Sequence, residues 1–100
     1  MHGLSVVEML MIYITEVHMV DGSGHEHIAD LRWRNPQSGK TGESSREALV
    51  RWIRDKDGTA KVHGQGTRDA TVGVVTANPP YLRTYADGVW TNNLLSLPRY

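Results

Sequence analysis

The amino-acid sequence predicts an α+β domain: a small antiparallel sheet of four to five strands, one α-helix packed on one face, and a C-terminal tail closing the other. Several short segments are rich in β-branched and aromatic residues, which favour strands. Only one segment, near the middle of the chain, carries apolar residues at helical spacing. A chain of 100 residues forms one domain, which we place at residues 11–100, after an N-terminal extension at residues 1–10.

The first two expected strands are joined by a glycine-rich turn. Residues 11–20 are apolar on both alternating faces, which predicts a central strand with two covered faces. Residues 21–24 contain two glycines and predict the turn. Residues 26–34 alternate between apolar residues facing inward and charged residues facing water, which predicts the second strand. A loop is expected over residues 35–42, because a proline and two glycines there oppose regular pairing.

The single helix is expected to begin at a capping box. Ser44 and Glu47 stand three residues apart, so each can satisfy a backbone N–H at the helix start. The following apolar residues recur at helical spacing and form one stripe: Ala48, Leu49, Trp52 and Ile53. Asp57 and Gly58 end the helix, and Gly58 is expected to supply the left-handed cap.

The second half of the chain predicts further strands separated by turns. In order, these are a strand at 60–63, a turn at 64–67, a strand at 68–77, a break at 78–80, a strand at 81–86, a turn at 87–88 and the tail at 89–97. One helix covers only one face of a sheet, whereas Ile12 and Ile14 would lie on the other. Either the tail or a second subunit must therefore cover that face, and the second subunit would make a homodimer.

Composition argues against several classes of function. The chain contains 11 basic and 11 acidic residues, so the excess of positive charge typical of non-specific nucleic-acid binding is missing. It contains no cysteine, which removes disulfides, thiolate metal sites and cysteine nucleophiles, and favours a cytoplasmic location. No apolar run approaches the roughly 20 residues of a membrane span. We therefore expect no membrane association. The first ten residues lack Lys and Arg, and Glu8 interrupts their apolar stretch, so we also expect no signal peptide.

The richest group of candidate functional residues lies in the C-terminal run at residues 81–98. It combines aromatic rings, an arginine, a turn and an asparagine pair, and the candidates are Tyr81, Arg83, Tyr85, Asp87, Trp90 and Asn92. One interpretation is a structural clamp, in which an Arg83–Asp87 bridge and an asparagine-capped turn hold the tail. The other is a polar binding site framed by aromatic side chains.

Other motifs are weaker. His18, His25 and His27 lie near the first hairpin at a spacing that could serve two metal ligands, but solvated hairpin histidines are the favoured interpretation. No serine stands in a Gly-x-Ser-x-Gly motif, and neither glycine-bearing turn has the spacing of a phosphate-binding loop. We therefore expect no catalytic residues, no metal and no cofactor.

Two stretches of the sequence carry a resemblance to a known family. Residues 81–88, Tyr-Leu-Arg-Thr-x-Ala-Asp-Gly, followed by Asn-Leu-Leu-x-Leu-Pro at 93–98, resemble the signature of a family of short bacterial, archaeal and phage proteins known as domain of unknown function 3892. The similarity extends from about Met11 to the end and includes the helix region. It implies a small α+β domain of prokaryotic or phage origin, and it implies no activity or catalytic residues.

Three hypotheses of function follow. The first is a non-catalytic interaction module that binds a protein partner, such as a host factor if the source is a phage. The alternative is a nucleic-acid-binding accessory protein, which would use Arg32, Arg34, Arg51, Arg54 and Arg83. The third, less favoured, is a small metal-dependent enzyme built on the three histidines named above.

Overall fold

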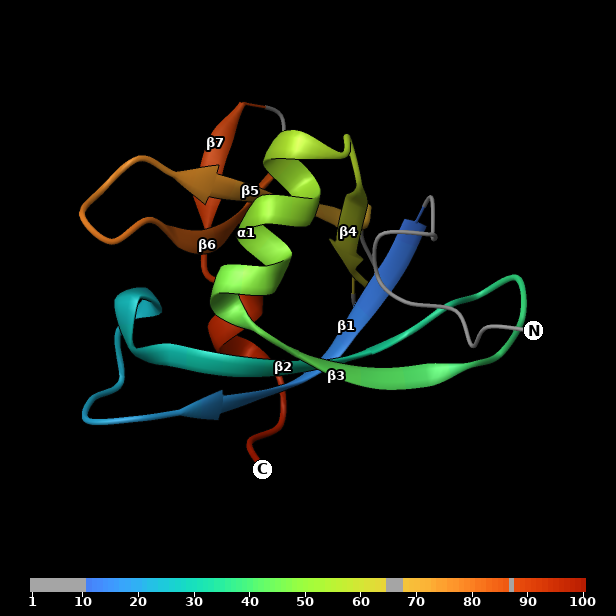
Figure 1. Ribbon diagram of the computed structural model, residues 1–100, viewed down its shortest axis with the longest axis horizontal. Helices are drawn as coiled ribbons and strands as arrows, with labels where there is room; N and C mark the ends of the chain where they lie inside the picture. The colour runs from blue at the N-terminus through green and yellow to red at the C-terminus, as the bar shows by residue number, and fades with distance from the viewer. Residues whose placement is uncertain (1–10, 65–67, 87) are drawn as a thin grey trace.

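The computed structural model describes residues 11–64, 68–86 and 88–100, and Figure 1 shows their arrangement. The elements, in chain order, are β1 (Met11–Met19), η2 (His25–His27), β2 (Ile28–Arg34), β3 (Thr41–Ser45), α1 (Arg46–Asp55), β4 (Thr59–Val62), β5 (Ala70–Val75), β6 (Tyr81–Ala86), β7 (Val89–Thr91) and η3 (Leu94–Ser96). The expected extension at residues 1–10, most of the expected turn at 64–67, and Asp87 lie outside the described residues.

The strands form one mixed sheet in the order β3-β2-β1-β4-β5-β6-β7. The predicted α+β class with one helix is confirmed, but the prediction of four to five strands, all antiparallel, was wrong. The described residues form seven strands, and β4 pairs with β1 in the parallel sense. The reason is that the chain returns to β1 through α1, and a connection through a helix brings a strand back in the same direction.

The first two residues of β3 were predicted to belong to a loop, because a proline and two glycines fall within residues 35–42, and its last two were assigned to the start of the helix. In the structure Gly42 pairs with Trp33 across the β2–β3 ladder. A Cβ atom at position 42 would overlap the Trp33 ring, so glycine is needed for the indole to lie across this strand. The indole Nε1 donates a hydrogen bond to Ser44 Oγ over 3.0 Å. The glycine that argued against a strand is therefore what allows this pairing.

Both ends of α1 differ in detail from the prediction. The N-cap is Ser45, whose Oγ accepts a hydrogen bond from the backbone N–H of Ala48 over 3.1 Å, whereas Ser44 binds the tryptophan instead. At the other end, the positive φ of 55° belongs to Asp57 rather than to Gly58. Gly58 is required for a different reason, since a Cβ atom there would overlap the buried Trp52 ring.

The core brings the apolar residues of β1 together on one side. An irregularity in the pairing of β1 with β2 between Ile14 and Glu16 shifts the alternation, so that Ile12, Ile14 and Val17 are all buried. The helix α1 packs against β2 and β3 on one half of the sheet and β5 and β6 on the other (Figure 1). The face of Ile12 and Ile14 that suggested a homodimer is thus covered within a single chain.

The C-terminal segment, which we define as residues 92–100, packs on the same core. Leu94 is fully buried, and Leu95 and Leu97 lie against the core. The strand β4 pairs only with the first three residues of β1, and the C-terminal segment pairs with β1 further along. Val17 N–H donates to the Pro98 carbonyl over 3.0 Å, and Tyr100 N–H donates to the Val17 carbonyl over 3.2 Å. Both apolar and backbone contacts therefore hold this segment to the domain.

Candidate functional site

Strand alternation places several of the sequence-predicted site residues on one outer face of β5, β6 and β7. Along β6, Leu82 and Thr84 are buried, so the side chains of Tyr81, Arg83 and Tyr85 point to the opposite face. The hairpin register then sets Trp90 of β7 directly across from Tyr85. Tyr81 lies at the far end of β6, opposite Val75 and away from the hairpin turn.

The aromatic pair, Tyr85 and Trp90, is the most exposed apolar feature of this face. The two rings meet edge to face, with centroids 5.6 Å apart and an interplanar angle of 76°. Tyr85 keeps 40% of its surface exposed and Trp90 45%. Val89 is 65% exposed, but it alternates with Trp90 along β7 and so points to the opposite face. Gly73 of β5 lies beneath the pair, and a Cβ atom there would approach Tyr85 Cε1 to 3.0 Å and Trp90 Cη2 to 3.3 Å. The missing side chain lets both rings lie close to the sheet.

Arg83 has a structural role beside this pair. Its Nε donates to the Thr91 carbonyl over 3.2 Å, and one terminal nitrogen donates to Asn92 Oδ1 over 3.1 Å. The hydroxyl groups of Thr84 and Thr91 are hydrogen-bonded at 2.7 Å just below. Arg83 and Asn92 therefore clamp the end of β7, while Asp87, the expected partner of Arg83, lies outside the described residues. Arg83 and Asn92 thus form hydrogen bonds that hold the hairpin, as a structural clamp would, whereas Tyr85 and Trp90 stay partly exposed beside them.

The three histidines of the first hairpin have different contacts. His18 Nδ1 forms a hydrogen bond with the backbone oxygen of Tyr100, and His27 Nδ1 forms one with the Val20 carbonyl over 3.1 Å. His25 is buried against β6, and burial, followed by the nearby charge of Arg83, lowers its pKa. Within the described ranges, no group of three His, Asp or Glu side chains is arranged to hold a metal ion.

A cluster that sequence analysis missed joins β1 to the hairpin of β4 and β5. Tyr13 donates its hydroxyl hydrogen to Asp69 Oδ2 over 2.7 Å, and the His63 ring stacks on Tyr13 with centroids 3.7 Å apart. The hydrogen bonds from Tyr13 and from the Gly64 N–H lower the pKa of Asp69, and the same bond to Asp69 raises the pKa of Tyr13. Tyr13 and Asp69 stand 56 residues apart, so no local motif announces their contact.

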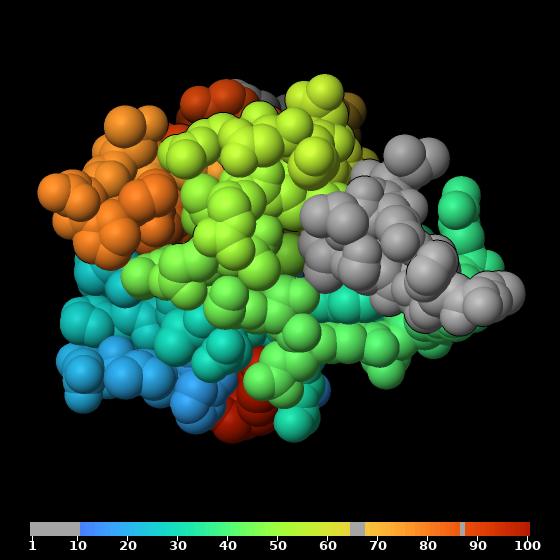
Figure 2. Space-filling view, in the orientation of Figure 1, coloured from blue at the N-terminus to red at the C-terminus, as the bar shows by residue number. Residues whose placement is uncertain are grey.

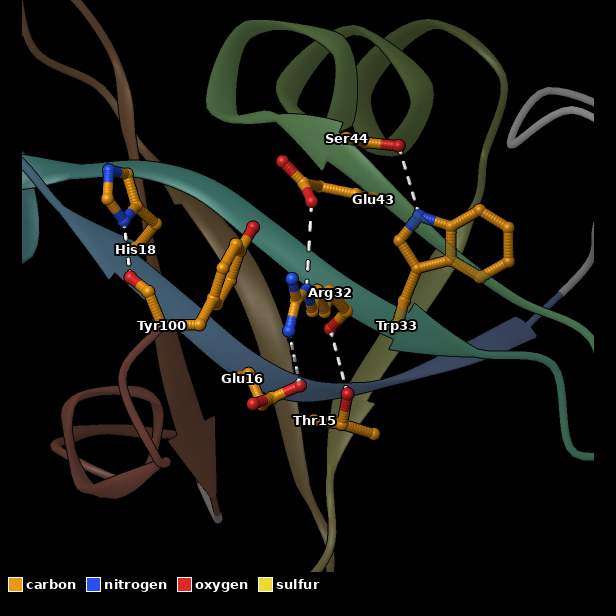
Figure 3. Close-up of polar contacts among 8 residues, drawn as sticks. All are labelled: Thr15, Glu16, His18, Arg32, Trp33, Glu43, Ser44 and Tyr100. Atoms are coloured by element: carbon orange, nitrogen blue, oxygen red, sulfur yellow. Dashed lines mark hydrogen bonds and ion pairs between the residues drawn. The ribbon is translucent and has the colours of Figure 1, made fainter.

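A second polar cluster lies on the outer face of β1, β2 and β3 (Figure 3). The Arg32 guanidinium lies 3.4 Å from Glu16 Oε1 and 3.7 Å from Glu43 Oε1. The Tyr100 ring covers this guanidinium, with the Arg32 Cζ atom 3.9 Å from the ring centroid. Burial, followed by the negative charge of Glu43, raises the pKa of Tyr100 to about 12. This cluster holds the end of the C-terminal segment on the sheet.

The arginines of the nucleic-acid hypothesis do not form one basic face. They come from three elements: Arg32 and Arg34 from β2, Arg51 and Arg54 from α1, and Arg83 from β6. Arg32 is paired with two glutamates and covered by a ring, and Arg83 is engaged in the clamp. Arg51 and Arg54 of α1 are both exposed, and neither takes part in an ion pair with another described residue.

Comparison with known families finds the same family that the C-terminal run resembles. Residues 13–98 match the family described as protein of unknown function, DUF3892. The chain belongs to this family. Comparison of this DUF3892 chain with curated proteins and with solved structures finds no match. No helix in the described part of this family member is long and apolar enough to span a membrane.

Proposed function

We propose that this DUF3892 protein is a non-catalytic, cytoplasmic interaction module that binds a protein partner through the aromatic pair, Tyr85 and Trp90. The observation that carries the proposal is the exposure of two large rings side by side on the last hairpin of the sheet. Tryptophan and tyrosine are enriched among the residues that dominate binding energy at protein interfaces. The absence of cysteine supports the cytoplasmic setting.

The contacts that hold the aromatic pair in place favour its binding to a protein partner. The rings rest on Gly73, and the clamp of Arg83 and Asn92 holds the end of β7, so the hairpin presents them from a braced position. A rigid aromatic surface loses little side-chain entropy when a partner covers it. A partner is therefore expected to place an apolar patch of its own over this hairpin.

The experiment is a quantitative comparison of binding and stability for matched variants. Affinity purification from the native host with mass spectrometry identifies the partner, and titration calorimetry measures its binding to purified variants. Trp90→Ala and Tyr85→Ala should each weaken binding by at least about tenfold, as expected for central interface aromatics. Both variants should keep a thermal unfolding midpoint close to that of the wild type, because the two side chains are partly exposed.

Two further variants make this comparison specific. Val20→Ala removes an apolar side chain that is 44% exposed, similar to Trp90, but lies on the first hairpin, and it should bind as the wild type does. Arg83→Ala should lower the unfolding midpoint, because it removes both hydrogen bonds of the clamp. A partner whose affinity is unchanged by Trp90→Ala and Tyr85→Ala would refute the proposal.

A further inference from the structure

A shallow groove of about 260 Å³ lies between α1 and the turn that joins β5 to β6. We call it the helix–turn groove, and its lining residues are Glu47, Val50, Arg51, Arg54, Pro79 and Pro80. In Figure 2 the helix, in yellow-green, and the turn, in orange, lie side by side on the face toward the viewer. None of its lining residues belongs to the aromatic pair or to the clamp.

The rim of the helix–turn groove carries two positive charges that lack partners. Arg51 and Arg54 are exposed, and neither side chain forms an ion pair or a hydrogen bond with any other described residue. The one carboxylate of the rim is already engaged, since Glu47 Oε2 accepts from the Arg46 guanidinium over 3.1 Å. The groove therefore presents an uncompensated pair of guanidinium groups to solvent.

The floor of the helix–turn groove is apolar. Val50 is only 3% exposed and closes the bottom, while Pro79 and Pro80 form the opposite wall. Proline offers no backbone N–H, so this wall contributes ring surface and carbonyl groups only. A groove with an apolar floor and guanidinium groups at its edge fits a chain that carries an apolar side chain next to a carboxylate.

The geometry points to the helix–turn groove as a binding site for an acidic peptide segment of a protein partner. An apolar side chain of the segment lies between Val50 and the prolines, and flanking carboxylates bind Arg51 and Arg54. A nucleic acid fits less well, because Glu47 lines the same groove and Asp55 follows Arg54 on α1, so the positive charge is confined to two side chains and does not follow a continuous phosphate backbone. This inference does not depend on the proposed role of the aromatic pair.

The test uses a displayed library of random peptides of roughly nine residues, selected on the full-length protein. Selected sequences should be enriched in Asp or Glu next to an apolar residue. The double variant Arg51→Gln/Arg54→Gln should lose this enrichment and should stay folded, because glutamine is a good helix former at exposed positions. Arg34→Gln makes the same kind of charge change on β2, outside the groove, and should select the same acidic sequences as the wild type.

Fluorescence anisotropy with one selected peptide then measures the effect. The double variant should bind at least about tenfold more weakly, and replacing the acidic residues of the peptide by their amides should cause a similar loss. The inference is overturned if selection yields no acidic enrichment or if the double variant binds equally well. It is also overturned if a DNA duplex displaces the peptide and binds more tightly. Trp90→Ala should bind this peptide normally; a loss there would place the peptide on the aromatic pair and would leave the proposed function standing.

Discussion

His25 is buried with one ring nitrogen left without a hydrogen-bond partner among the described residues. Only 8% of the side chain is exposed, and its Nε2 atom is buried without a hydrogen-bond partner among the described residues. Burial and the charge of Arg83 lower its pKa from the ordinary value of 6.5, and the nearby Glu26 acts in the opposite direction. The neutral imidazole is therefore the form that the fold accepts.

This burial predicts a loss of stability in mild acid. The unfolded chain protonates His25 near pH 6.5, whereas the folded protein does so only at lower pH, so the unfolded state binds more protons in between. The free energy of unfolding should therefore fall as the pH decreases through 6.5 toward the lowered folded-state pKa. Urea unfolding of the wild type and of His25→Leu at about pH 7.5 and about pH 5 measures the difference.

The variant should have the shallower pH dependence of the two. His27→Gln is the matched control, because that imidazole is the more exposed neighbour on the same turn and should leave the slope close to that of the wild type. Identical slopes for the wild type and His25→Leu would contradict this account of His25.

At the scale of single elements, two adjacent residues at the end of α1 meet different structural requirements. Asp57 has the left-handed backbone conformation, with φ of 55°, which favours glycine. Gly58 instead faces the ring of Trp52, which is only 1% exposed and has no room to move. The requirement for glycine at position 58 is therefore one of space.

We predict opposite effects of substitution at these two positions. Gly58→Ala should destabilise the protein by about 1–3 kcal/mol, because the new methyl group meets the packed indole. Asp57→Gly should leave stability unchanged or raise it slightly, because it relieves an unfavourable backbone angle. Chemical denaturation of both variants measures this, and a Gly58→Ala protein as stable as the wild type would show that the helix end is not packed as described.

The elements that could be predicted from the sequence were those encoded locally. The spacing of Leu49, Trp52 and Ile53 was sufficient for α1, and alternation was sufficient for most of β2. The strand β3 escaped prediction because composition alone interprets Gly42 as part of a turn. In the structure this glycine makes room for the ring of Trp33, nine residues earlier. The parallel pairing of β1 with β4 escaped it too, because a strand's neighbour depends on the path of the connection.

In the candidate site, too, only the local contacts could be predicted from the sequence. Tyr85 and Trp90 flank a short turn, so the sequence alone placed them near each other. The assignment of Arg83 to the clamp required the register of β6 with β7, which brings the Thr91 carbonyl within 3.2 Å of its Nε. The contact of Tyr13 with Asp69 spans 56 residues and could not be found without the fold.

At the scale of the whole molecule, the C-terminal run has two roles. Residues from Leu94 onward close the core, and the chain then pairs with β1 at Val17 and ends with Tyr100 over Arg32. The hairpin that precedes them leaves the aromatic pair outside. One stretch of sequence therefore completes the domain and also presents the most exposed aromatic rings among the described residues.

The closing role predicts a large effect for one leucine. Leu94→Ala should destabilise the protein by about 2–5 kcal/mol, because Leu94 is fully buried in the core. Val89→Ala, at a position that is 65% exposed on the preceding hairpin, should change stability by about 0.5 kcal/mol or less. Thermal and urea unfolding of the two variants provide the comparison, and equal stabilities would mean that residues 92–100 do not belong to the folded core.

The most direct measurement of the central claim is site-specific photo-crosslinking in the native host. A photoreactive phenylalanine derivative replaces Trp90 in one strain and Val20, which is similarly exposed, in another. The proposed function predicts that the probe at position 90 crosslinks to one defined protein, while the probe at position 20 gives no such product. The same products from both positions, or none from position 90 in cells that contain the folded protein, would contradict it.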